Sequence, residues 1–128
     1  MKFPSLILLL FILLVGKSAG AQSFEGVWKG TSLCQVKSSP CHDENVVYYI
    51  SKNSTGNSYE MIANKIVNGK EEDMGALSFI YYDKQKVFVS IDSLYNARWE
   101  FRITGNMMKG RLTYKGYLYR VIEVKKEN

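Results

Sequence analysis

The sequence has few of the residues that most often build reactive sites. Its 128 residues include one histidine, two cysteines and two prolines. A Ser-His-Asp or Cys-His site would depend on His42 alone, and no nucleophile motif surrounds any serine. The later glycines recur at turns with no helix after them, which excludes a phosphate-binding loop. A pair of carboxylates that meet only in the fold stays open. We otherwise expect no enzymatic activity and no cofactor.

The positive charge is also too small and too scattered to define a partner. Lys and Arg number 17 against 12 Asp and Glu, which gives a formal net charge of +5. Nucleic-acid binding needs a concentrated basic face, and the lysines here are dispersed along the chain. We therefore expect no nucleic-acid partner, and the length predicts a single domain.

Long hydrophobic runs are absent except at the N-terminus. Residues 6–15 form an unbroken run of ten apolar side chains after Lys2, and Ala19-Gly20-Ala21 follows. This order is typical of a cleaved signal peptide. Ten residues fall short of the roughly 20 that span a bilayer. The sequence predicts a signal peptide over 1–21, a mature domain over 22–128 without a membrane span, and a secreted or periplasmic location.

The two cysteines are predicted to pair with each other. Export places Cys34 and Cys41 in an oxidising compartment, where thiols this close in a loop form a disulfide. The alternative is a metal site that adds His42, Asp43 and Glu44. Those three residues are consecutive, so a strand would send the middle one the other way, and zinc sites usually space cysteine pairs more closely. The disulfide is favoured, and we expect no metal.

The mature chain alternates apolar and polar residues in short runs and shows no helical periodicity. We predict eight strands, at 24–33, 46–51, 59–67, 74–82, 87–91, 97–104, 107–114 and 117–125. Short connections, such as Asn68-Gly69, favour antiparallel hairpins. Eight such strands can close into an up-and-down barrel, with room for packed side chains or one small ligand. A two-sheet sandwich is the competing architecture, but no long crossover supports it.

Alternation within the strands predicts which side chains point inward. In 97–104, Trp99 and Phe101 share the apolar face. Arg120 lies on an otherwise apolar face of the last strand. A buried guanidinium needs a partner, so Arg120 either stacks on an indole or lies at the rim of the barrel or outside it. Both placements stay open.

The stretch 24–30, Phe-Glu-Gly-Val-Trp-Lys-Gly, resembles the Gly-x-Trp signature that opens the first strand of calycins, the superfamily of lipocalins, fatty-acid-binding proteins and avidins. The resemblance implies an all-β, lipocalin-like barrel in which Arg120 packs over Trp28. The chain departs from lipocalins in lacking a C-terminal helix. It also lacks the helical pair that fatty-acid-binding proteins place between their first two strands. The resemblance therefore concerns the fold and leaves the ligand open.

Two pairs of adjacent tyrosines bear on whether the barrel contains a cavity. In Tyr48-Tyr49 and in Tyr81-Tyr82, one ring of each pair must point inward, and such rings either line a cavity or fill it.

The first hypothesis is a non-catalytic, monomeric binding protein for a small apolar or amphiphilic ligand. Its candidate ligand-binding residues are Trp28, Tyr48, Trp99, Phe101 and Arg120. The alternative is a solid barrel that binds a protein partner, as an interaction module or inhibitor, through the loops 34–44 and 68–74.

Overall fold

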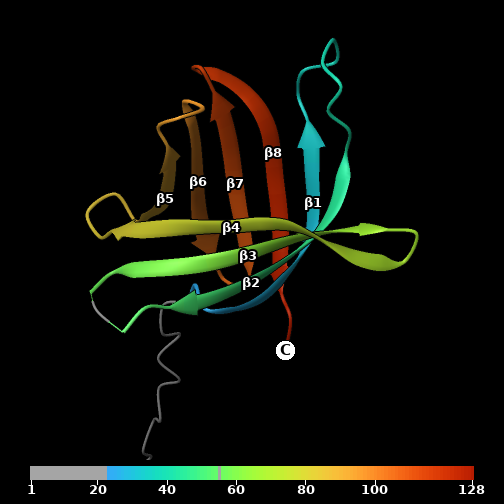
Figure 1. The fold of residues 1–128 in the computed structure, drawn as a ribbon. Helices are drawn as coiled ribbons and strands as arrows, with labels where there is room; N and C mark the ends of the chain where they lie inside the picture. Colours follow the sequence, from blue (N-terminus) through green and yellow to red (C-terminus); the bar gives the residue numbers. More distant parts are fainter. Residues whose placement is uncertain (1–22, 55) are drawn as a thin grey trace, which may run out of the picture.

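A computed structural model describes residues 23–54 and 56–128 and shows an all-β barrel. Each strand pairs antiparallel with the next, and the last pairs with the first (Figure 1). The strands are β1 (Gly26–Cys34), β2 (Glu44–Lys52), β3 (Ser58–Val67), β4 (Lys70–Tyr82), β5 (Val87–Asp92), β6 (Ala97–Thr104), β7 (Met107–Tyr114) and β8 (Tyr117–Lys126). The predicted closed up-and-down barrel of eight strands is confirmed. The predicted signal peptide and its cleavage point lie outside the described residues.

The strand bounds agree with the predicted ones to within two residues, except at β4. Residues 70–73, predicted as loop, belong to this strand. Asn68 and Gly69 adopt φ of 51° and 77°, the left-handed values that suit a two-residue hairpin turn. Val67 therefore pairs directly with Lys70, and the ladder continues to the turn. The resulting β3–β4 hairpin projects past β1 (Figure 1).

Aromatic side chains fill one end of the barrel. The ring of Phe24, just before β1, stacks on Phe88 with centroids 3.9 Å apart and meets Phe79 edge-on at 5.6 Å. Trp28 is fully buried beside them, and its Nε1 donates to the Phe24 carbonyl oxygen at 3.0 Å. Burying large aromatic surfaces in edge and stacked contacts stabilises this end.

The seam between β4 and β5 is incomplete. The two strands share three residue pairs, from Ile80–Val89 to Tyr82–Val87, although β4 has 13 residues. The N-terminal part of β4 thus has no ladder partner on this side. Figure 1 shows β4 running at a steep angle to β5. The barrel is splayed here, at the end opposite the aromatic packing.

The predicted inward faces are confirmed. In β6, Phe101 is buried and Trp99 packs against the core. Tyr48 is buried while Tyr49 is exposed, and Tyr81 packs on Phe88 at 4.5 Å while Tyr82 is exposed. One ring of each tyrosine pair therefore points inward. Within the described residues, no helix is long and apolar enough to cross a bilayer.

Candidate ligand-binding cavity

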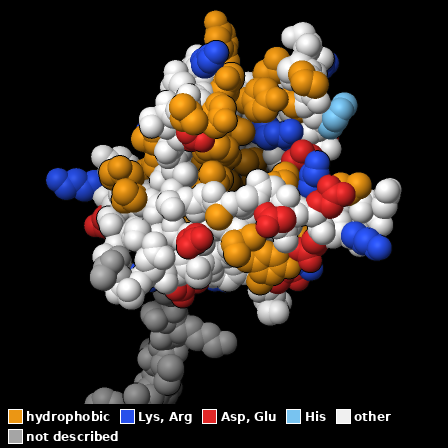
Figure 2. Space-filling model, viewed as in Figure 1, with side chains coloured by type: hydrophobic (Ala, Val, Ile, Leu, Met, Phe, Trp, Pro, Cys, Tyr) orange, Lys and Arg blue, Asp and Glu red, His pale blue; other side chains and the backbone are white. Residues whose placement is uncertain are grey.

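A cavity of about 350 Å³ lies at the splayed end of the barrel. Figure 2 shows the hollow, with hydrophobic side chains exposed inside it. Strands β2 to β4 form one wall, and β6 to β8 form the other. Its apolar lining includes Met61, Ala63, Leu77, Leu112 and Ile122.

Four of the five predicted ligand-binding residues line this cavity: Tyr48, Trp99, Phe101 and Arg120. The register explains part of this grouping, because Trp99 pairs with Leu112 and Leu112 pairs with Arg120 across β6, β7 and β8. Trp28 does not line the cavity. It belongs to the packed core near the aromatic end, so its role in the structure is packing.

Phe101 forms the floor between the cavity and the aromatic end. Its ring lies edge-on to Phe79 at 5.5 Å and to Tyr48 at 6.0 Å. The neighbouring position on β7 is Gly110, and a Cβ there would overlap the Phe101 ring. The glycine thus lets the ring lie flat against the β7 backbone. A side chain at this position would force the ring to move.

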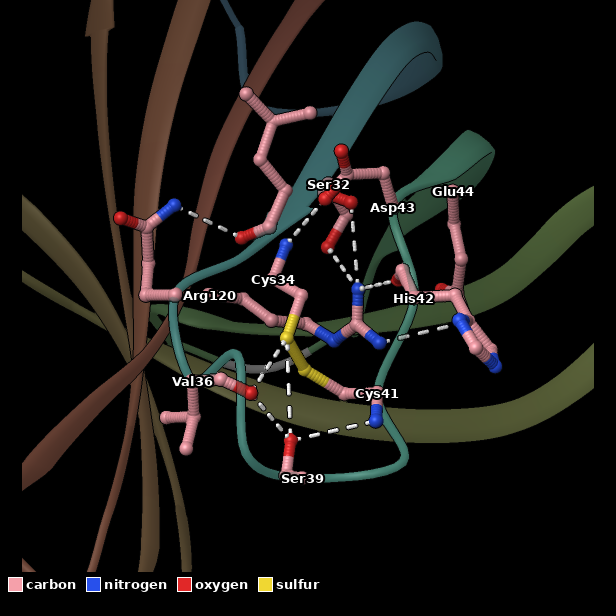
Figure 3. The surroundings of a disulfide bond; sticks show 11 residues. Ser32, Cys34, Val36, Ser39, Cys41, His42, Asp43, Glu44 and Arg120 are labelled. Atoms are coloured by element: carbon pink, nitrogen blue, oxygen red, sulfur yellow. Dashed lines mark hydrogen bonds and ion pairs between the residues drawn. A yellow bond between two sulfur atoms is a disulfide. The ribbon is translucent and has the colours of Figure 1, made fainter.

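Arg120 lies at the rim of the cavity, where three oxygen acceptors and one carboxylate surround its guanidinium (Figure 3). Its Nη1 donates to the His42 carbonyl oxygen at 3.0 Å and to both the carbonyl oxygen and the Oγ of Ser32 at 3.3 Å. Its Nη2 lies 3.5 Å from Glu44 Oε1, and the side chain is 12% exposed. A partly buried guanidinium is tolerated here because a carboxylate and three oxygen acceptors compensate its desolvation.

The resemblance-based contact between Arg120 and Trp28 is wrong. On β1, Trp28 pairs with Lys126, whereas Arg120 pairs with Cys34 at the far end of the strand. The cation over the indole is Lys126, with its Nζ 5.5 Å from the ring centroid. The same Nζ donates to the Ser23 carbonyl oxygen at 2.8 Å. The antiparallel register of β8 therefore decides between the two predicted placements, and Arg120 occupies the rim.

The predicted disulfide between Cys34 and Cys41 is present and shapes this rim. Within the loop, Ser39 Oγ donates to the Val36 carbonyl oxygen at 2.7 Å (Figure 3). The backbone N–H of Cys34 donates to Asp43 Oδ1 at 2.8 Å. These contacts hold the chain that presents the His42 carbonyl to Arg120. Across residues 23–54 and 56–128, no three potential metal ligands cluster.

Tyr48 places a neutral hydroxyl in the cavity wall. Burial raises the pKa of this phenol well above its ordinary value, the Glu44 carboxylate raises it further, and Arg120 partly opposes both. The hydroxyl has no hydrogen-bond partner in the part of the chain that the structure describes. It is therefore available to donate to or accept from a ligand.

Sequence reasoning missed Ser32 and Glu44 as rim residues. The strand containing Tyr48 was predicted to begin at Val46, but β2 begins at Glu44. Glu44, Val46 and Tyr48 alternate onto the same face, so extending the strand by two residues would have pointed the carboxylate inward. The pairing of Glu44 with Arg120 depends on closure between β1 and β8. No local pattern contains that information.

No protein-family model, no curated protein and no solved structure matches this chain. The features that bear on function are accordingly the barrel, its cavity and the chemistry of the rim.

Proposed function

We propose that this protein is a non-catalytic binding protein for a small amphiphilic molecule. The observation that carries the proposal is the cavity of about 350 Å³, which is apolar inside and polar at its rim. Small-molecule sites usually combine an apolar lining with a few placed polar groups, in volumes of roughly 300 to 1,000 Å³. This cavity has that composition and lies at the small end of the range.

The arrangement of the lining indicates how such a ligand would lie. Its apolar part would contact Met61, Leu77 and Phe101 in the interior. Its polar group would reach the Tyr48 hydroxyl and the Arg120 guanidinium. Because Glu44 already neutralises part of the Arg120 charge, the rim suits a weakly acidic or hydrogen-bonding head group better than a multiply charged one.

The barrel closure and the Gly-x-Trp motif support a calycin-like, lipocalin-type assignment. The disulfide supports export to an oxidising compartment, secreted or periplasmic. The alternative hypothesis, a solid barrel acting through its loops, has less support because the barrel interior is hollow at one end.

The two tryptophans provide an internal control for a binding experiment. Trp99 lines the cavity and Trp28 does not. Trp28→Phe leaves Trp99 as the emitter, and Trp99→Phe leaves Trp28. A brominated medium-chain carboxylic acid quenches only the indoles it contacts. Titration should quench the Trp28→Phe protein, saturating at one ligand per chain, and leave the emission of the Trp99→Phe protein nearly unchanged.

Two outcomes would refute the proposal. Equal quenching of both variants would place the probe outside the cavity, and a linear rise without saturation would show collisional quenching only. Circular dichroism of each variant confirms that the barrel is intact before titration. Native mass spectrometry of the unmodified protein gives the stoichiometry independently.

A further inference from the structure

Large apolar side chains stand exposed on two turns at the cavity end of the barrel. In the β5–β6 turn, Leu94 is 82% exposed and Tyr95 59%, and in the β7–β8 turn Tyr117 is 76% exposed. The two turns are joined, because the backbone N–H of Lys115 donates to the Asn96 carbonyl oxygen at 2.9 Å. The exposed apolar side chains therefore stand on neighbouring turns at the same end of the barrel.

The disulfide loop borders this surface. A groove of about 860 Å³ separates residues 35–39 from the β7–β8 turn, and its lining includes Lys37, Tyr114, Lys115, Tyr117 and Tyr119. In Figure 2, hydrophobic and basic side chains gather at the upper end of the molecule, above the hollow. We call the combination of residues 35–39, 92–96 and 114–119 the tip surface.

The lysines of the tip surface are free to meet an external anion. Neither Lys37 nor Lys115 has a carboxylate partner in the described part of the chain; Lys115 lies over the Tyr114 ring, 5.3 Å from its centroid. Asp92 is the one carboxylate among residues 35–39, 92–96 and 114–119, so the tip surface carries two lysines against one carboxylate. Asp92 Oδ1 accepts from the backbone N–H groups of Leu94 and Tyr95 at 3.1 and 3.3 Å.

We propose that the tip surface docks on an anionic lipid surface. Leucine and tyrosine side chains that stand singly on turns can insert among lipid head groups, where an amphipathic phenol is well accommodated. Lysine keeps its ammonium in the head-group layer while its stem lies along apolar surface. Each such lysine near an anionic membrane contributes about 1 kcal/mol, equivalent to roughly fivefold in affinity.

Docking in this orientation would bring the cavity rim close to the lipid. The groove and the Arg120 rim border the same connection between β1 and β2: residues 35–39 line the groove, and Arg120 Nη1 donates to the carbonyl oxygen of His42, which directly follows the disulfide. An amphiphile dissolved in the bilayer would then enter the cavity without crossing open water. This second step rests on the proposed function, whereas the docking itself does not.

Flotation with vesicles tests the docking directly. The exported form of the protein is mixed with vesicles of phosphatidylcholine alone or of phosphatidylcholine with phosphatidylglycerol. We expect binding to the anionic vesicles and a loss of about tenfold or more on combining Leu94→Ser with Tyr117→Ser. Lys37→Gln with Lys115→Gln should remove the preference for anionic lipid, roughly fivefold per lysine.

Matched controls lie at the opposite end of the barrel, where Tyr82 and Lys84 are also exposed. Tyr82→Ser with Lys84→Gln should bind vesicles as the unmodified protein does. Equal losses in the control and tip variants would overturn the proposal, as would the absence of binding to anionic vesicles. Self-association that Leu94→Ser abolishes, without vesicle binding, would assign the tip surface to a second copy of the chain and also overturn it.

The two proposals fail separately. Quenching of Trp99 by the brominated acid is measured without vesicles, and the tip variants should leave it unchanged. Vesicle binding with no quenching of Trp99 would refute the ligand-binding function and support the docking. Quenching of Trp99 with no vesicle binding would support the ligand-binding function and refute the docking.

Discussion

The two ends of this barrel are built from the same eight strands and differ in what fills them. At one end, Phe24 fills the interior, with its ring centroid 3.9 Å from that of Phe88 and 5.6 Å from that of Phe79. At the other, β4 leaves β5 after three residue pairs, and the facing apolar walls enclose a cavity. A complete ladder brings opposite walls close enough for side chains to interdigitate. An incomplete ladder leaves part of the apolar surface without a packing partner, and a ligand can then cover that surface.

Two cationic side chains of β8 also differ between the packed end and the open end. Lys126 lies over the buried Trp28 ring at the packed end, where it covers the indole. Arg120 lies at the rim of the cavity, paired with Glu44 and partly exposed. One strand thus supplies a structural cation to the packed end and a candidate ligand-contacting cation to the open end.

The largest expected difference between the ends concerns the two tryptophans. Trp28→Ala should lower the free energy of unfolding by about 3 to 5 kcal/mol, because it removes a fully buried indole from a packed region. Trp99→Ala should lower the free energy of unfolding by less, since one side of the Trp99 ring already faces the cavity. Urea denaturation of both variants measures the difference. A loss below about 1 kcal/mol for Trp28→Ala would show that the packed end does not hold the barrel together.

The disulfide should matter to the open end and leave the packed end intact. Reduction, or replacement of Cys34 and Cys41 by serine, should lower the free energy of unfolding by about 2 to 3 kcal/mol. The effect is modest because a short closed loop restricts the unfolded chain only a little. Amide chemical shifts should change in residues 34–44 and around Arg120 while those near Trp28 stay in place. Global unfolding on reduction at room temperature would contradict this division.

The rim pair should control which head groups the cavity accepts. Glu44→Gln removes the carboxylate that neutralises Arg120 and should strengthen binding of the brominated acid by roughly fivefold, the scale of a partly exposed ion pair. Arg120→Met should weaken it. The matching brominated alcohol serves as the control, and its affinity should change little in either variant. Equal changes for acid and alcohol would mean that the head group does not reach the rim.

Much of the fold was predictable from the sequence because alternation and turn chemistry are local. The Asn68-Gly69 turn, the inward faces of β6 and the pairing of Cys34 with Cys41 all depend on neighbours in the chain. The cavity depends on something else: how far β4 follows β5. The placement of Arg120 depends likewise on the register between β1 and β8. Both are properties of closure between distant segments, so local patterns could name candidate residues without arranging them.

The smallest expected effect concerns the β3–β4 hairpin, whose base borders the open end. Glu71 Oε1 accepts from the Tyr49 hydroxyl at 2.7 Å and from Asn64 Nδ2 at 3.3 Å. The bond from Tyr49, then that from Asn64, lowers the pKa of Glu71, and the same contact with Glu71 raises the pKa of Tyr49.

A carboxyl whose pKa is lowered by folding stabilises the fold above its unfolded pKa, and that contribution is lost as the pH falls through its folded pKa. The raised pKa of Tyr49 has the opposite sign: its contribution is present below the unfolded pKa and is lost at alkaline pH. Tyr49→Phe should therefore return the Glu71 pKa toward its ordinary value and remove a small part of the acid dependence of stability. NMR titration of the Glu71 side chain measures this, with Tyr82→Phe as the control. An unchanged Glu71 titration would mean that the Tyr49–Glu71 hydrogen bond does not form in solution and that the hairpin is held to β2 by the β2–β3 ladder alone.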